Sequence, residues 1–278
     1  MPYGKNKKPI VSIIMGAYNI EHTKTFIYSI NSILKQSFSN FELIICDDGS
    51  TDNTWNIITS YATKDRRIRL LKNDKNLGLA ATLNRCIDIS NADLIARHDA
   101  DDFSDITRLE KQIYFLNTHP EIMFVGSNVA LFDEDGVYAN RVFPEFPSKK
   151  DFMFTMPFVH GALLFRKSAL VKANQYRVSI ETRRAEDYDL LMRMYSLNLY
   201  GANLQENLYF FLENHSALAR RKYRYRLDEA VVRWKGFHSL GLMPMAFPYV
   251  IKPLIVGLIP RKILLKLKSY YRKRMVAH

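Results

Sequence analysis

The chain has 278 residues, of which 47% are hydrophobic and 24% are charged. A chain of this length can bury a full core without disulfides, and its composition excludes an intrinsically disordered protein or one built from long apolar runs. It has 40 Lys and Arg against 28 Asp and Glu, a formal net charge of +12, so its surface should attract phosphates, nucleic acid or an acidic membrane leaflet.

The cysteines and the chain ends indicate the cellular setting. Cys46 and Cys86 lie in apolar segments without metal-type spacing, so we expect buried, reduced thiols in a cytosolic protein. Residues 1–9 are basic but lack the apolar stretch and cleavage site of a secretory signal. Prolines, a lysine and a glycine interrupt the apolar stretch 243–260, so we expect no transmembrane segment.

The first hundred residues alternate between short β-rich runs and amphipathic helical patterns. This alternation predicts an α/β fold with a mostly parallel, Rossmann-like sheet flanked by helices, and with ligands at the carboxyl ends of the strands. Ser50 or Thr51 is expected to cap the second helix. The predicted strands are 11–15, 41–46, 68–72 and 93–97, and the helices between them contain Phe26 to Leu34, Trp55 to Tyr61 and Leu79 to Ile89.

The second half is less regular. Its predicted elements are a helix over 106–117, strands over 124–132 and 161–165, a helix over 187–199 and a largely helical basic segment from residue 220. The expected division is one domain over 8–215, with a first half over 8–105 and a second half over 106–215. A basic amphipathic helical extension (216–278) follows.

An acidic cluster, Asp99, Asp101 and Asp102, follows the fourth predicted strand. Three carboxylates in four residues repel each other unless a cation compensates. Asp99 and Asp101 are the expected ligands of Mg²⁺ or Mn²⁺, which would bridge nucleotide phosphates and neutralise the charge of the leaving group. The alternative is a solvated acidic loop that caps the helix starting near Ile106.

Four ordered blocks together resemble glycosyltransferase family 2, with its GT-A fold. They are residues 17–19, 46–52, 76–80 and 96–102, and a fifth block, Glu186-Asp187-Tyr188-Asp189-Leu190, resembles the family's Glu-Asp motif. The resemblance covers roughly residues 8–211 and is greatest to capsule and exopolysaccharide enzymes. The first block departs from the family, which usually carries Pro where this chain has Gly16 or Ala17.

The resemblance implies a donor site for a nucleotide diphosphate sugar, with uridine as the expected nucleoside. It makes residues 8–105 the nucleotide-binding half and residues 106–215 the acceptor half. It places Ala17 and Tyr18 near the base. It gives Asp48 the hydrogen bond from the uracil imide, which leaves Asp47 a structural role. The acidic cluster takes the remaining roles: Asp99 near the ribose and the metal, Asp101 on the metal, and Asp102 on the donor or the acceptor.

An inverting transfer is a single displacement that needs one general base near the acceptor hydroxyl. By resemblance that base is Asp187, with Glu186 as an alternative or as an acceptor-binding group. The competing interpretation is that both acids only occupy the first turn of a helix, where their charges interact favourably with the helix dipole.

Other basic residues are weaker candidates for acceptor or phosphate contacts. They are His160, Arg183, Arg184, Arg220 and Arg221. The arginines are candidates because guanidinium groups match phosphates well, with a solvated basic loop as the competing interpretation. For His160 the competing interpretation is a purely structural role. We find no Gln-x-x-Arg-Trp block, which processive members of the family carry, so the addition of a single sugar is favoured over polymerisation.

The C-terminal segment from Pro248 interleaves apolar residues with lysines and arginines. This pattern predicts binding to an anionic membrane surface, with a core-packed helix as the alternative. We expect a cytoplasmic enzyme, peripheral on the inner face of the membrane, that acts on a lipid-linked glycan acceptor. A nucleic-acid binder is not favoured, because no nucleic-acid module organises the charge. A regulatory scaffold with a nucleotide site, and a protein partner or homo-oligomer, stay open as alternatives.

Overall fold

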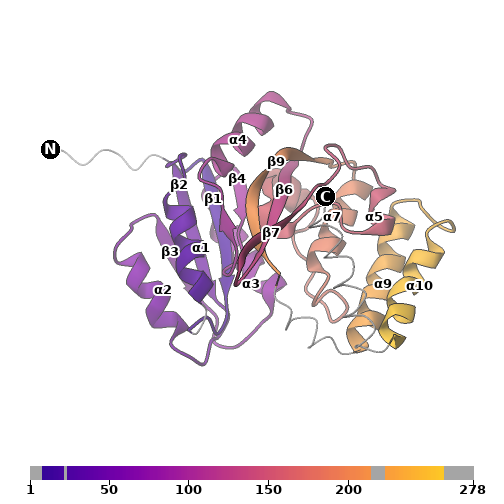
Figure 1. Cartoon of the computed structure of the whole chain (residues 1–278), viewed down its shortest axis with the longest axis horizontal. Coiled ribbons are helices and arrows are strands. Elements are labelled where there is room, and N and C mark those ends of the chain that lie inside the picture. Colours follow the sequence, from indigo (N-terminus) through magenta and orange to yellow (C-terminus); the bar gives the residue numbers. More distant parts are fainter. Residues whose placement is uncertain (1–7, 22–23, 214–222, 260–278) are drawn as a thin grey trace.

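A computed structural model describes residues 8–21, 24–213 and 223–259 (Figure 1). Arg220, Arg221 and residues 260–278 lie outside the described residues. The expected domain boundary at residue 215 also falls outside them, so that division stays a prediction.

Within the described residues, the strands form one nine-stranded sheet in the order β3-β2-β1-β4-β8-β6-β9-β5, with β7 paired to β6. The first four strands in this order are parallel, as predicted, whereas β8 is antiparallel to both of its neighbours. The strands are β1 (Val11–Ala17), β2 (Phe41–Asp47), β3 (Ile68–Lys72), β4 (Leu94–Arg97), β5 (Phe103–Ser104), β6 (Phe124–Asp133), β7 (Gly136–Arg141), β8 (Leu164–Arg166) and β9 (Gly201–Leu212).

Helices cover both faces of the sheet, because side chains alternate along each strand. Ile13 and Met15 pack with α1 (Lys24–Leu34), α2 (Thr54–Ala62) and α4 (Arg108–Thr118). Ile14 and Ile44 pack on the other face with α3 (Leu79–Ile89), α6 (Lys167–Lys172) and α7 (Glu186–Ser196). The predicted α/β fold with a flanked, mostly parallel sheet is therefore confirmed.

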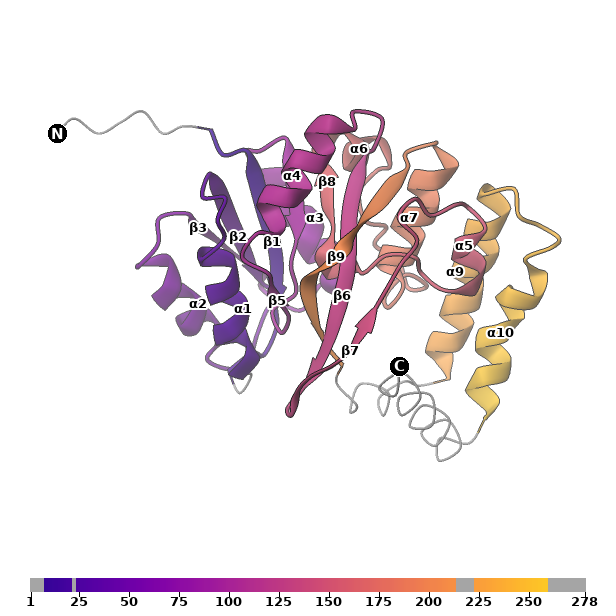
Figure 2. The same cartoon turned by 45° about the horizontal axis from the view of Figure 1, so that its top comes forward.

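The C-terminal helices α9 (Arg224–Ser239) and α10 (Phe247–Leu258) lie side by side at the end of the molecule farthest from α2 (Figures 1 and 2). Phe237 of α9 and Val250 of α10 belong to the same hydrophobic cluster as Leu190 of α7. The short helix α5 (Asp151–Phe154) adds Phe152 to that cluster. None of the described helices combines the length and the apolar character that crossing a bilayer requires.

Two local predictions are wrong. The helix α2 begins at Thr54, and the Asp52 carboxylate accepts hydrogen bonds from the Thr54 amide and hydroxyl, so neither Ser50 nor Thr51 caps it. The Ser50 hydroxyl instead accepts a bond from the Asn19 amide in the neighbouring loop. The predicted strand 161–165 starts only at Leu164, because a 3₁₀ turn, η1 (His160–Ala162), precedes it.

Candidate active site

The loops after β1 and β2 are bonded to each other at one edge of the sheet. The Asp48 amide donates to the Ala17 carbonyl at 2.8 Å, and the Thr51 amide donates to the Asn19 side chain at 3.0 Å. Gly49 has φ +68°, and a Cβ there would lie 2.3 Å from the Lys75 backbone, so only glycine fits this turn. Ala17 is buried and Tyr18 is 48% exposed. Tyr18 therefore presents an accessible ring beside this pair of loops.

Asp48 has a structural function that the sequence did not reveal. Its carboxylate accepts hydrogen bonds from the Asn73 side chain at 2.7 Å and from the Leu77 and Gly78 amides at 2.8 and 3.0 Å. Gly78 is the residue that precedes α3, so Asp48 fixes the start of this helix against β2. Its hydrogen bond to a uracil stays a prediction. The buried Asp47 accepts a bond from the Ser50 amide, consistent with a structural role.

Buried groups hold Asp99, the first residue of the acidic cluster, in place. The Arg97 guanidinium is almost completely buried and forms an ion pair with the half-buried Asp99 carboxylate. The Tyr209 hydroxyl accepts a bond from the Asp99 amide at 3.1 Å, and the Ser29 hydroxyl donates to the Asp99 carbonyl at 2.9 Å. A Cβ at Gly161 would lie 2.1 Å from the Tyr209 hydroxyl and 2.7 Å from Asp99 Oδ2. Asp99 therefore has little freedom to move.

A second buried arginine extends this support. The Arg108 guanidinium donates to the Arg97 carbonyl at 2.8 Å and lies over the Tyr209 ring. Burial lowers the pKa of Arg108 to about 10, which leaves it charged at neutral pH. Sequence reasoning missed Arg97, Arg108 and Tyr209. The one available signal was a charged residue, Arg97, at the end of an otherwise apolar strand.

The remaining two acids of the cluster differ in exposure. Asp102 is buried and accepts a bond from the Leu212 amide at 2.7 Å, while Asp101 is exposed over only part of its surface. Desolvation and the Asp99 and Asp101 charges raise the pKa of Asp102, and desolvation with the Asp99 charge raises that of Asp101 to about 6. This crowded negative charge would be relieved by a dication.

The described residues contain no group of three or more acidic, His or Cys side chains placed to hold a metal. Asp99 and Asp101 still fit Mg²⁺ or Mn²⁺, because such ions are commonly held by one or two carboxylates together with substrate phosphates and water. The residues present are thus compatible with a metal whose remaining ligands come from the donor.

A cavity of about 580 Å³ lies between the start of α7 and α9. Glu186 and Asp187 line it, as do Arg183 and Arg184, so the structure brings these four predicted residues together. Arg184 lies over the Tyr225 ring, and Arg183 pairs with Asp228 at 3.5 Å. Sequence reasoning missed the contribution of α9, which lines the cavity with Tyr225, Arg226, Asp228, Glu229 and Arg233.

The two acids at the start of α7 have raised pKa values. Burial and then the Asp187 charge raise the pKa of Glu186 to about 8, and one of its carboxylate oxygens is buried without a partner. Burial and, more weakly, the Asp99 charge raise the pKa of Asp187 to about 6, against the effect of backbone amides and Arg97. At neutral pH Glu186 is mainly protonated and Asp187 mainly ionised. Separated pKa values of this kind divide the acid and base roles.

His160 is buried, and its Nε2 lies 2.7 Å from the Tyr176 hydroxyl. It is not among the residues that line the cavity. Burial lowers the pKa of His160 well below its ordinary value, so the ring is neutral. A contact of His160 with the acceptor stays a prediction.

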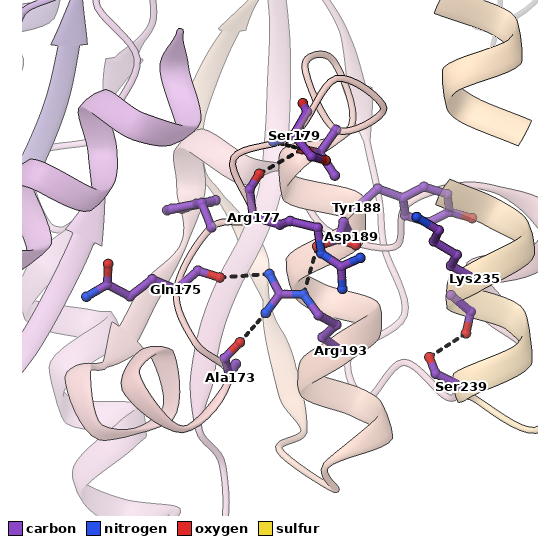
Figure 3. A network of polar contacts seen from close by, with 12 residues as sticks. Ala173, Gln175, Arg177, Ser179, Tyr188, Asp189, Arg193, Lys235 and Ser239 are labelled. Atoms are coloured by element: carbon purple, nitrogen blue, oxygen red, sulfur yellow. Dashed lines mark hydrogen bonds and ion pairs between the residues drawn. The ribbon is translucent and has the colours of Figure 1, made fainter. Parts of the chain in front are cut away.

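A polar network one turn along α7 fixes this helix to the loop after α6 (Figure 3). Arg193 forms an ion pair with Asp189 at 2.7 Å and donates to the Ala173 and Gln175 carbonyls. Arg177 approaches the same Asp189 carboxylate at 3.6 Å. The helix that carries Glu186 and Asp187 is thus held by charged contacts as well as by its apolar face.

Comparison with known proteins shows what this chain is similar to. The family model described as glycosyl transferase family 2 matches residues 12–174. The chain is 41% identical over 272 residues to a putative glycosyltransferase, EpsE of Bacillus subtilis (strain 168), covering 98% of this chain and 96% of EpsE.

Two further comparisons bear on the fold and on chemistry. A segment of 120 residues is 42% identical to WfaP of Escherichia coli, a UDP-Glc:alpha-D-GlcNAc-diphosphoundecaprenol beta-1,3-glucosyltransferase, covering 43% of this chain and 45% of WfaP. The fold is similar to the S. aureus TarS 1-349 structure in complex with UDP-GlcNAc, with a TM-score of 0.69 at 18% identity. That match covers 87% of this chain and 72% of the TarS chain.

Proposed function

The chain belongs to glycosyltransferase family 2 and is a glycosyltransferase, and from this we propose an inverting, metal-dependent transfer of a single sugar from a UDP-sugar. The acceptor is a lipid-linked or polysaccharide glycan in the biosynthesis of a capsule or exopolysaccharide. WfaP supports this acceptor class, because its name specifies a diphosphate-linked polyprenyl acceptor and a UDP-sugar donor.

The observation that carries the proposal is that the charge of Asp99 acts on Asp187, which comes from a distant part of the sequence and lines the cavity. Burial raises the pKa of Asp187 most, and the charge of Asp99 adds to it, so the donor-side cluster and the α7 acids influence each other electrostatically. Asp187 also lines a cavity that has arginines on its wall. A donor at the acidic cluster and an acceptor in the cavity would therefore meet beside an ionised carboxylate.

In the proposed reaction Asp187 takes the proton of an acceptor hydroxyl, and the hydroxyl oxygen attacks the anomeric carbon. The bond between that carbon and the diphosphate oxygen breaks on the opposite face, so the nucleoside diphosphate leaves and the configuration inverts. The protonated Glu186 would donate a hydrogen bond within the cavity. A divalent cation at Asp99 and Asp101 would neutralise the charge of the leaving diphosphate.

The cavity arginines support an anionic group on the acceptor. Arg183 and Arg184 lie next to the two acids, and Arg226 and Arg233 lie across the cavity on α9. Guanidinium groups bind phosphate oxygens bidentately, so they would hold the diphosphate of a lipid-linked acceptor. The acids alone would repel such a group, which makes the arginines necessary on this proposal.

The metal part is tested with Asp101→Ala. Asp101 is exposed in a loop, so its loss should leave the fold intact while Mn²⁺-dependent binding of UDP, followed by calorimetry, is abolished. Asp135→Ala, an exposed acid in the turn between β6 and β7, is the matched control. Unchanged UDP affinity and metal dependence in Asp101→Ala would refute the proposed metal site.

A further inference from the structure

The exposed side of the α9–α10 pair carries large apolar side chains. On α9, Leu227, Val231 and Trp234 recur at the spacing of one helical face, and each is more than 40% exposed. On α10, Phe247, Ile255 and Leu258 are 46%, 59% and 73% exposed. We call these six residues the apolar face.

A direct ring contact joins the two helices on this face. The Trp234 and Phe247 rings lie 6.3 Å apart at an interplanar angle of 81°, an edge-on packing of two exposed aromatic groups. The core needs neither ring, because Phe237 and Val250 already bury the inner sides of α9 and α10. The six side chains nevertheless keep a large exposed area, and exposed apolar groups gathered in this way mark an interaction surface.

Helix α9 has the cavity and the apolar face on different sides. Arg226, Glu229 and Arg233 line the cavity, whereas Leu227, Val231 and Trp234 are exposed to solvent. A partner on the apolar face would consequently lie one helix away from Asp187. The proposed diphosphate-binding arginines would be next to that partner.

The sequence that follows α10 indicates which partner this is. Residues 260–278 contain Arg261, Lys262, Lys266, Lys268, Arg272, Lys273 and Arg274 and no Asp or Glu. Each cation near an anionic bilayer adds electrostatic attraction, and apolar burial supplies the second signal that stable binding needs. Tryptophan and phenylalanine are suited to the boundary between headgroups and acyl chains. A dry protein interface would not require this excess of positive charge.

We propose that the apolar face of α9 and α10 docks on an anionic lipid bilayer, with the basic residues after α10 adding electrostatic attraction. The bilayer contact itself rests on the exposed side chains. Its purpose, the delivery of a lipid-linked acceptor to the cavity, rests on the proposed function. Bilayer binding and sugar transfer are measured separately, so either can fail alone.

Tryptophan fluorescence tests the contact directly, because the chain has only two tryptophans. Trp55→Phe leaves Trp234 as the single reporter in the full-length protein. Vesicles of phosphatidylglycerol and phosphatidylethanolamine should shift its emission to the blue, and brominated lipid should quench it. Vesicles of phosphatidylcholine alone should do so much less. An emission spectrum unchanged by anionic vesicles would overturn the proposal.

A triple variant tests how much of the bilayer binding comes from the apolar side chains rather than from the basic residues. Val231→Ser, Trp234→Ser and Ile255→Ser together should lower the fraction that sediments with anionic vesicles about tenfold, while Mn²⁺-dependent UDP binding is retained. Tyr28→Ser with Tyr114→Ser, two exposed aromatic residues on α1 and α4, is the control and should bind vesicles normally. If the triple variant instead converts a dimer to a monomer with vesicle binding unchanged, the face is a protein interface and the proposal is wrong.

Discussion

Two pairs of neighbouring carboxylates, Asp47–Asp48 after β2 and Glu186–Asp187 at the start of α7, are held in opposite ways. Asp48 accepts three protein hydrogen bonds and Asp47 accepts one from a backbone amide. Asp47 and Glu186 each keep one buried carboxylate oxygen without a partner, but burial raises the pKa of both α7 acids. The first pair stabilises the loops that follow β1 and β2, whereas the second has the raised pKa values that the proposed catalysis needs.

The sharpest test of this contrast is Asp187→Asn, which keeps the size of the side chain but cannot accept a proton. Turnover should fall by about 10² to 10⁴, while UDP affinity changes little. Transfer to a polyprenyl-diphosphate glycan and calorimetric UDP binding would measure the two effects. Asp88→Asn, an exposed acid on α3, is the control.

The pH dependence of the wild-type enzyme gives a second measurement of the same base. Because burial raises the pKa of Asp187 to about 6, kcat should fall as the pH drops through about 6 and the base gains a proton. Near-normal turnover of Asp187→Asn would move the base role to Glu186 or elsewhere.

A substitution of Asp48 should mainly lower the stability of the folded protein. Asp48→Asn replaces an acceptor of three bonds by an amide whose NH₂ group cannot accept the bonds from the Leu77 or Gly78 amides. We expect the free energy of unfolding in urea to fall by about 1–3 kcal/mol. Asp74→Asn, an exposed acid in the same region, should be nearly neutral. Equal effects of the two variants would remove the structural role of Asp48.

Gly161→Ala tests whether the support beneath Asp99 is as tight as the distances indicate. The new methyl group would overlap the Tyr209 hydroxyl and Asp99 Oδ2, so we expect a loss of about 1–3 kcal/mol in unfolding free energy. Mn²⁺-dependent UDP affinity should fall about tenfold. In the double variant with Tyr209→Phe, the missing hydroxyl should restore part of the stability, and strict additivity would show that the two residues do not interact.

Glu186→Gln should stabilise the protein, whereas Asp48→Asn and Gly161→Ala should destabilise it. Because burial raises the pKa of Glu186 to about 8, the folded protein holds a proton that the unfolded chain releases above about pH 4.5. Wild-type stability contributed by this group therefore falls as the pH rises from about 4.5 to 8. The variant should exceed wild type by on the order of 1–2 kcal/mol at about pH 8.5 and match it at pH 4, by thermal unfolding. A constant difference across that range would contradict the raised pKa.

The sequence predicts the first half of the fold better than it predicts the wall of the cavity. The strands and helices of residues 11–97 were predictable because apolar periodicity and loop chemistry agree there. The family resemblance also named Asp99, Asp101, Glu186 and Asp187 as candidate site residues, and their roles stay predictions. The wall of the cavity on α9 was not predictable, because Arg226 and Arg233 reach it only through the packing of α9 on α7. The prediction that Ser50 or Thr51 caps α2 was wrong, because the Ser50 hydroxyl bonds to the loop after β1 instead.

The ion pair between Arg193 and Asp189 has a consequence for the choice between the two α7 acids. Neighbouring residues of a helix point in directions about 100° apart, so Glu186 and Asp187 cannot both face an acceptor hydroxyl in the same way. A turn of α7 about its own axis by that angle would exchange their positions. Arg193 donates to the Ala173 and Gln175 carbonyls and pairs with Asp189, which opposes such a rotation (Figure 3). On the proposed mechanism, the identity of the base thus depends on the angular setting of one helix, which is fixed by residues that do not line the cavity.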